Sequence, residues 1–329
     1  MRTLSTNFIY LLAPFNIIVI ILLFNNCESN TNLPQAIGDP LELIVVKDQN
    51  LYEESFYDNL KFILKRDIGP SPQPENTLSI IEVNADKFSG ILKRHQNILL
   101  ISKADSFSIG YKTNMFANNQ LVLFLNCSSS QDLNANTQKL KSLIDKIKLT
   151  EIERMILAHQ KNPSSNLNKQ ISTKHNLDFI FPSGFFYAYE DSNTTWIRRE
   201  TPSISQGIFF TNFSKDINLD NINELRNKIN SKISNHILGP IEGSFMSVDK
   251  SAPITIDTFL FDKSEAIKIQ SLWRMENDFM GGVFVAYFLA DHSPPTLIYS
   301  YLYAPGEPKK IPLLQLEALM ASLNKSKTK

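Results

Sequence analysis

Short apolar runs alternate with amphipathic stretches along the whole chain, and this order most constrains its fold. In the first half, runs typical of strands lie at 41–46, 78–83, 97–102 and 121–126. Apolar residues recur at helical spacing over 51–65, 85–92 and 137–149. Thr150 and Glu153 form a capping-box pattern, which predicts a separate helix over 151–161.

The second half repeats this order. A strand is predicted at 178–189, broken at Pro182-Ser183-Gly184, and further strands at 254–261, 283–289 and 296–303. Helices are predicted at 219–235, 264–273 and 311–323. A hairpin at 194–213 has no counterpart in the first half, so we interpret it as an insertion.

Two further patterns indicate an internal duplication. The first amphipathic helix of each half is followed by a Gly-Pro pair, Gly69-Pro70 and Gly239-Pro240. Leu92, Arg94 and Asn97 share their spacing with a second set, Leu272, Arg274 and Asn277. We therefore predict an α+β protein of two fused, duplicated β-α-β-(α)-β-β-α halves, 41–161 and 176–324. Because neighbouring strands have short links, we expect mainly antiparallel sheets covered by helices.

The N-terminus has the features of an export signal. Residues 8–24 carry no charge and follow Arg2. As a helix they would span roughly 25 Å, which is short for a bilayer crossing. The run ends at Cys27 and resembles a bacterial lipobox, with Phe24 and Asn26 in place of the usual Leu and small residue. We predict a signal peptide over 1–26, lipidation of Cys27 and a polar tether over 27–40. The alternatives are an uncleaved signal anchor and a cleaved soluble protein.

Composition excludes several function classes. The formal net charge is +0 and no basic stripe occurs, so we expect no nucleic-acid partner. With Cys27 lipidated, Cys127 is the one remaining thiol, and no intrachain disulfide can form. The chain's 5 histidines lack metal-ligand spacing, and no nucleotide-binding or hydrolase motif occurs. We therefore predict no metal and no cofactor, and we assign no catalytic residue.

Two stretches carry the candidate site residues. The first runs from Trp273 to Gly282, and its candidate residues are Arg274, Asn277, Asp278, Gly281 and Gly282. Arg274 could bind an anion, and Glu276 or Asp278 could act as acid or base. The alternative is a structural corner in which Arg274 pairs with a carboxylate and Asn277 bonds to local backbone.

The second stretch is the inserted hairpin with Trp196 and Arg198, which alternate onto one face of a strand. Trp196 beside Arg198 could stack on a sugar or a headgroup. The alternative is an inward-facing Trp with arginine stems packed over it. The pair Lys309-Lys310 and the C-terminal tail are weakly basic, and we expect solvated ends there.

The motifs PQPENTLSIIEV, RHQNILLI, TWIRRE, GPIEGSFM, LWRMENDFMGGVFVAYF and YLYAPGEPKKIPLLQLEALM occur in this order. Together they resemble the domain-of-unknown-function family numbered 4837, over residues 38–323. The resemblance implies a predicted lipoprotein of Bacteroidetes bacteria and no assigned activity.

We therefore expect a lipid-anchored cell-envelope protein of a Gram-negative bacterium, in the outer membrane and facing the periplasm. Its expected role is a binding or scaffold module for an envelope protein or a glycan, and we favour binding over catalysis. The alternatives are an envelope hydrolase using acidic residues near Arg274 and a carrier of a small ligand.

Overall fold

The computed structural model describes residues 33–213 and 221–325. Its contacts divide the chain into residues 1–34 and one compact unit, residues 35–329. The following concerns the described residues of this unit. The predicted signal peptide and Cys27 lie outside the described residues.

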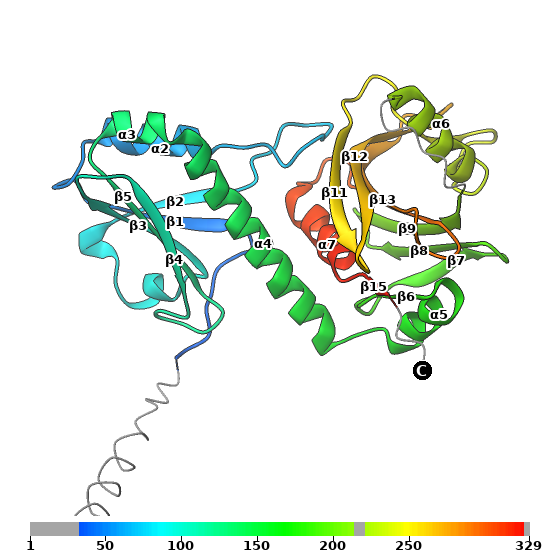
Figure 1. Cartoon of the computed structure of the whole chain (residues 1–329), viewed down its shortest axis with the longest axis horizontal. Helices are drawn as coiled ribbons and strands as arrows, with labels where there is room; N and C mark the ends of the chain where they lie inside the picture. The colour runs from blue at the N-terminus through cyan, green and yellow to red at the C-terminus, as the bar shows by residue number, and fades with distance from the viewer. Residues whose placement is uncertain (1–32, 214–220, 326–329) are drawn as a thin grey trace, which may run out of the picture. The chain divides into compact units, whose positions relative to one another are not determined.

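The first part of the unit is built on a five-stranded sheet of order β2-β1-β3-β5-β4 (Figure 1). Its strands are β1 (Glu42–Lys47), β2 (Ser79–Asn84), β3 (Asn97–Lys103), β4 (Ser108–Thr113) and β5 (Leu121–Cys127). All pairs are parallel except β4 with β5. The connection from β1 to β2 contains a helix and is long enough for the crossover that a parallel pair requires.

Helices cover one face of this sheet. They are α2 (Glu54–Leu64), α3 (Ser130–Ala135) and α4 (Thr137–Lys161), and their apolar stripes form a core with the inward side chains of β1, β3 and β5. The other face carries a smaller cluster around Ile44 and Ile98. Leu92 of the short 3-10 helix η2 (Gly90–Arg94) packs against that cluster, as does Phe88, which follows the 3-10 helix η1 (Ala85–Lys87).

The second part is built on an eight-stranded antiparallel sheet. Its order is β10-β12-β13-β14-β9-β8-β7, and β11 pairs with β12 off this path. The strands are β7 (Phe186–Glu190), β8 (Thr194–Glu200), β9 (Ser205–Asn212), β10 (Phe245–Val248), β11 (Thr255–Phe261), β12 (Ser264–Glu276), β13 (Gly281–Leu289) and β14 (Thr296–Tyr303). A small two-stranded sheet joins β6 (Leu177–Asp178) to β15 (Asn324–Lys325).

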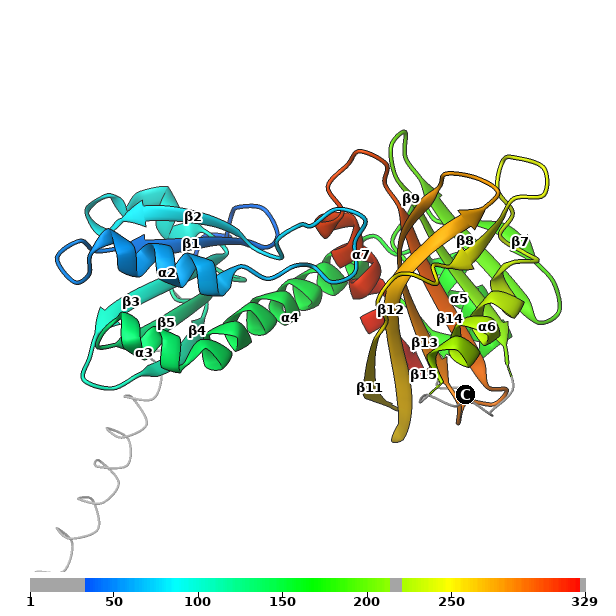
Figure 2. The ribbon, with the colours of Figure 1, turned by 90° about the horizontal axis from the view of Figure 1, so that it is seen from above.

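Both faces of the large sheet are buried in its middle. One face packs against α5 (Ser165–His175) and α7 (Lys310–Ala321). The opposite face packs against α6 (Ile222–Ile233), whose Leu225, Ile229 and Ile233 are fully buried. Figure 2 shows α6 lying over only part of the sheet.

Helix α7 joins the two parts. Its Leu313 and Leu316 belong to the core of the second part, whereas Leu314 belongs to the core of the first. The buried carboxylate of Glu317 lies between Lys148 of α4, at 2.8 Å, and Lys268 of β12, at 3.7 Å. The two parts therefore share one packed interface along this helix.

The α+β class and the helix-covered sheets are confirmed, with three corrections. The first sheet is mainly parallel, and its topology differs from that of the second, so the expected duplication is not observed. Residues 264–273 are not a helix but belong to β12, because Ile267, Ile269, Trp273 and Met275 alternate onto one sheet face.

The third correction concerns the two helices predicted over 137–161. They form one helix, α4. The Thr150 hydroxyl donates to the Lys146 carbonyl at 2.9 Å, inside the helix. It therefore does not cap a new helix start.

Candidate functional site

An open pocket lies on the large sheet beside α6. It has a volume of about 430 Å³, which lies within the range of ligand-binding sites. Its aromatic lining consists of Trp196 of β8, Trp273 of β12 and Tyr301 and Tyr303 of β14. The chain has 2 tryptophans, and both line this pocket. We call it the tryptophan pocket.

Two glycines allow these rings to lie flat on the sheet. A Cβ on Gly207 would come within 2.2 Å of the Tyr301 ring, and Tyr301 is its cross-strand neighbour. A Cβ on Gly282 would come within 2.0 Å of the Leu302 carbonyl and 2.9 Å of Trp273 Nε1. The Trp273 indole therefore crosses β13 above Gly282, and its N–H donates to the Leu302 carbonyl at 3.1 Å.

Three methionines complete the wall of the tryptophan pocket: Met246, Met275 and Met280. Thioether side chains are flexible and polarisable, so they adapt to apolar partners of different shape. Ile237, Leu238 and Pro240 extend this wall toward the pocket mouth. The lining is therefore mostly aromatic and aliphatic.

Arg198 and Glu200 supply the charge at the pocket. Their side chains form an ion pair at 2.5 Å, and the guanidinium lies 5.1 Å from the Trp196 ring centre. Neither Trp196 Nε1 nor Arg198 Nε has an acceptor of regular hydrogen-bond geometry. Burial raises the pKa of Tyr301 to about 12, although Arg198 and the nearby Trp196 partly oppose this. The phenol is therefore neutral and available as a hydrogen-bond donor.

The second candidate stretch lines an adjoining, more open pocket of about 720 Å³. Its lining includes all five candidates from that stretch: Arg274, Asn277, Asp278, Gly281 and Gly282. Trp273, Met275 and Met280 form a wall common to both pockets. The two candidate stretches, far apart in sequence, therefore line neighbouring pockets.

The polar groups of the second stretch have structural partners. Arg274 donates to Glu276 at 2.8 Å, and the pKa of Glu276 is lowered first by the Ser247 hydroxyl and then by Arg274. Asn277 donates to the Gly243 carbonyl at 3.0 Å. The Asp278 carboxylate accepts from the Phe279 N–H at 2.7 Å. These contacts fix the turn between β12 and β13, and they engage the groups that acid-base chemistry would need.

An exposed apolar rim surrounds the turn between the two pockets. Phe279 at the turn is 106% exposed, and Leu238 and Ile241 of the neighbouring loop are 63% and 52% exposed. The bond from Asn277 to Gly243 joins the turn to this loop. We call Leu238, Ile241 and Phe279 the apolar rim. Contiguous exposed apolar side chains of this kind mark interaction surfaces.

Sequence reasoning identified Trp196, Arg198 and the 273–282 stretch, which contains Met275 and Met280, but missed Tyr301, Tyr303 and Met246. Their signal was present, because Tyr299, Tyr301 and Tyr303 occur at every second residue of β14 and so share one face. Their convergence with Trp196 depends on long-range strand pairing.

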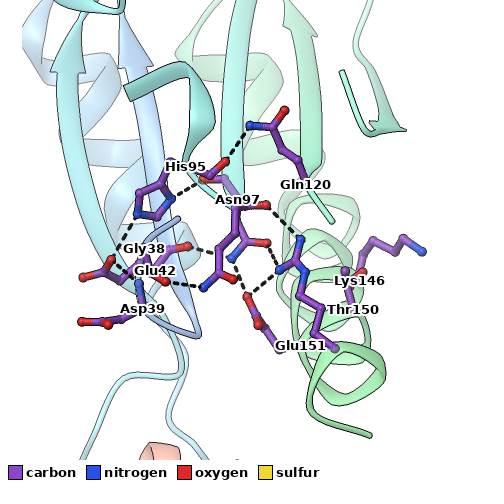
Figure 3. Close-up of polar contacts among 11 residues, drawn as sticks. Gly38, Asp39, Glu42, His95, Asn97, Gln120, Lys146, Thr150 and Glu151 are labelled. Carbon is purple, nitrogen blue, oxygen red and sulfur yellow. Dashed lines mark hydrogen bonds and ion pairs between the residues drawn. The ribbon is translucent and has the colours of Figure 1, made fainter. Parts of the chain in front are cut away.

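The first part contains a buried polar network that sequence reasoning did not single out (Figure 3). Asn97 donates to Glu151 at 2.6 Å, and Arg154 donates to both Asn97 and Glu151, at 2.9 and 2.8 Å. His95 lies 3.1 Å from Glu42. Asn97 and Glu42 begin their strands, whereas ligands of open α/β sheets bind at the carboxyl ends. We interpret the network as a link between α4 and the sheet.

The described residues contain no group of three or more His, Cys, Asp or Glu side chains placed to hold a metal ion. Among the helices that the structure describes, none combines the length and apolar character needed to cross a bilayer.

The fold and the pockets define a two-part α+β protein with two adjoining open pockets on its second sheet. Residues 164–322 match the model of the family described as Domain of unknown function (DUF4837). Residues 36–160 match a different one, described as Domain of unknown function (DUF8532). The predicted resemblance is thus confirmed for residues 164–322, while residues 36–160 match a second, different family. A search of curated proteins gave no match.

Proposed function

We propose that this chain is a lipid-anchored binding module of the cell envelope. In this proposal the tryptophan pocket and the apolar rim together dock a protein partner. The observation that carries the proposal is that exposed Leu238 lines the tryptophan pocket, while exposed Phe279 lines the adjoining pocket that shares a wall with it. A small ligand held in the pocket would leave this rim in water, whereas a protein partner would cover both.

The composition of the surface supports the same interpretation. Protein interfaces are enriched in Trp, Tyr, Phe, Met and Arg, and hot spots are enriched in Trp, Tyr and Arg. The pocket and rim combine these residue types. The carboxylates of Glu276 and Asp278 are held by Ser247, Arg274 and local backbone, which favours binding over the alternative of a hydrolase.

Photocrosslinking in intact cells tests the docking proposal. A photoreactive phenylalanine analogue replaces Phe279, and in a matched control it replaces Phe62 of α2, which is 73% exposed outside this surface. We expect a discrete protein adduct from position 279 and none from position 62. The adduct should disappear when Trp196→Ala is added, since this change removes part of the aromatic lining of the neighbouring tryptophan pocket. Equal adducts at both positions, or an adduct insensitive to Trp196→Ala, would count against the proposal.

A small ligand or a glycan is the second candidate occupant, and the pocket volume of about 430 Å³ favours it. Because both tryptophans line the pocket, their fluorescence reports any occupant directly. Envelope oligosaccharides and medium-chain fatty acids serve as probes. A saturable emission change that Trp196→Phe alters would support this candidate, and an emission spectrum unchanged by either probe class would favour the protein partner.

The anchor rests on the leader sequence and the lipobox-like end at Cys27. We propose that the anchored protein lies in the outer membrane of a Gram-negative bacterium and faces the periplasm, as expected from the leader sequence. Stable anchoring requires two acyl chains or more, which a lipidated cysteine would supply. Cys27→Ser should release the protein from the membrane fraction. Mass spectrometry of the native protein should find an N-terminus at Cys27 with added acyl mass, and any other N-terminus would overturn lipidation.

A further inference from the structure

Strand β11 forms an edge of the large sheet. It pairs with β12 over its whole length, and the structure records no second partner strand for it among the described residues (Figure 2). A sheet edge presents a row of unpaired backbone groups to any other strand. The free backbone groups of β11 are those that point away from β12.

The geometry of the β11–β12 hairpin determines which residues carry these groups. The turn between β11 and β12 has two residues, Asp262 and Lys263, with φ of 48° and 70°. Such a turn makes Phe261 and Ser264 a hydrogen-bonded pair, and pairs then alternate along the ladder. The backbone N–H and C=O groups of Ile256, Thr258 and Leu260 therefore point away from β12. Among the described residues, no backbone hydrogen bond beyond the ladder involves these three.

Apart from the charge of Asp257, this edge lacks the features that usually prevent strand pairing. Its sequence TIDTFLF contains no proline or lysine, and its register with β12 has no bulge. The edge strand β7, in contrast, has five residues and a register shift between Tyr187 and Tyr189. Leu260 of β11 is 79% exposed on the side of the sheet that α6 covers elsewhere. The edge is thus both open and apolar.

We propose that β11 pairs antiparallel with β11 of a second copy of this chain, about a twofold axis at Thr258. In this register Ile256 lies opposite Leu260 of the second copy, and each Thr258 lies opposite the other. Apolar and Thr–Thr pairs are favourable across antiparallel strands. Asp257, which carries the strand's charge, lies opposite Phe259, so like charges do not meet. The strand is therefore complementary to itself, as a twofold interface requires.

Disulfide trapping in the full-length, membrane-associated protein tests this register. Two Cα atoms in a hydrogen-bonded antiparallel pair lie about 5.5 Å apart, within reach of a disulfide. Mild oxidation of Thr258→Cys should give a covalent dimer. Thr255→Cys is the matched control, because the two copies of this exposed position would lie roughly 20 Å apart in the proposed register. The native Cys127 is buried and does not compete.

A second variant tests the interface without touching the β11–β12 ladder. Leu260→Lys places a charge on an already exposed position, so the monomer should stay folded. In the Thr258→Cys background it should lower the dimer yield by about tenfold. Equal dimer from Thr255→Cys, no dimer from Thr258→Cys, or a yield unchanged by Leu260→Lys would overturn the proposal. A disulfide from position 258 to a different protein would also contradict the proposal that the pairing strand belongs to a second copy of this chain.

Discussion

The Glu75 carboxylate caps helix α7 at Lys309. One oxygen accepts the backbone N–H groups of Lys309 and Lys310, at 2.7 and 3.1 Å. Glu75 belongs to the loop between α2 and β2. A side chain of the first part therefore accepts the free backbone N–H groups at the start of α7, which packs in the core of the second part. This contact and the Glu317 ion pairs hold α7 between the two parts.

Removal of the cap should cost stability. Glu75→Ala leaves two backbone donors of α7 without their partner, and we expect a loss of about 1 kcal/mol in the free energy of unfolding. Glu75→Gln keeps an acceptor but not the charge and should lose less. Glu53→Ala is the matched control, because exposed Glu53 precedes α2 without a side-chain cap bond. Chemical unfolding measures all three, and equal losses at positions 53 and 75 would contradict the capping role.

Gly282 should not tolerate a side chain. In Gly282→Ala the new Cβ would meet the Leu302 carbonyl and the Trp273 indole, so we expect a loss of about 2–4 kcal/mol. The fluorescence of Trp273 should shift to longer wavelength as the ring leaves its buried position. Gly110→Ala is the control, since no heavy atom lies within 4 Å of its added Cβ. If the two variants unfold at the same denaturant concentration, the close packing of Trp273 over Gly282 is wrong.

The buried ion pair of the first part allows a double-mutant test. Arg154→Met leaves the Glu151 carboxylate buried with Asn97 as its remaining partner, and we expect a loss of about 3–5 kcal/mol. Adding Glu151→Gln removes the uncompensated charge and should restore part of that loss. Arg94→Met is the control, because the Arg94 guanidinium donates to the Gln35 carbonyl at an exposed site rather than to a buried carboxylate. Additive effects of the two changes at 151 and 154 would show that the pair is not coupled.

The elements of the fold were more predictable than their arrangement. Apolar periodicity indicated β1, α2, β3 and α7 because it is a local signal. Strand direction in the first sheet depended on crossover connections such as the one through α2, so the antiparallel expectation was wrong there. The same expectation held for the second sheet. The burial of Lys309 was also missed, since its Nζ binds Gln73 of a distant loop. Contacts of this kind have no local pattern.

The candidate site, like the fold, was predictable in its parts but not in their arrangement. Local density of aromatic and charged residues indicated Trp196, Arg198 and the 273–282 stretch. Their proximity results from the register of β8, β9, β14, β13 and β12, five strands from two separate regions of the sequence, 194–212 and 264–303. A register shift of one residue would reverse the face of each side chain. No local feature of the sequence fixes such a register.

His175 should make stability depend on pH. Its side chain is buried, its Nε2 lies 2.8 Å from the Thr195 hydroxyl, and its ring stacks on Phe210. Burial first, and Lys174 second, lowers its pKa to about 4, while Glu190 opposes this. In the unfolded chain the pKa is about 6.5, so between these values the unfolded state binds a proton that the native state does not.

The contribution of His175 is therefore fully present above pH 6.5 and is lost as the pH falls toward 4. The loss should amount to about 3 kcal/mol. His175→Gln keeps a polar group near Thr195 but cannot titrate, so its free energy of unfolding should fall less steeply between pH 7.5 and 4.5. Burial also lowers the pKa of His159, so part of the slope should remain in the variant. Urea unfolding across this pH range measures both slopes, and identical slopes would show that His175 is not the titrating group.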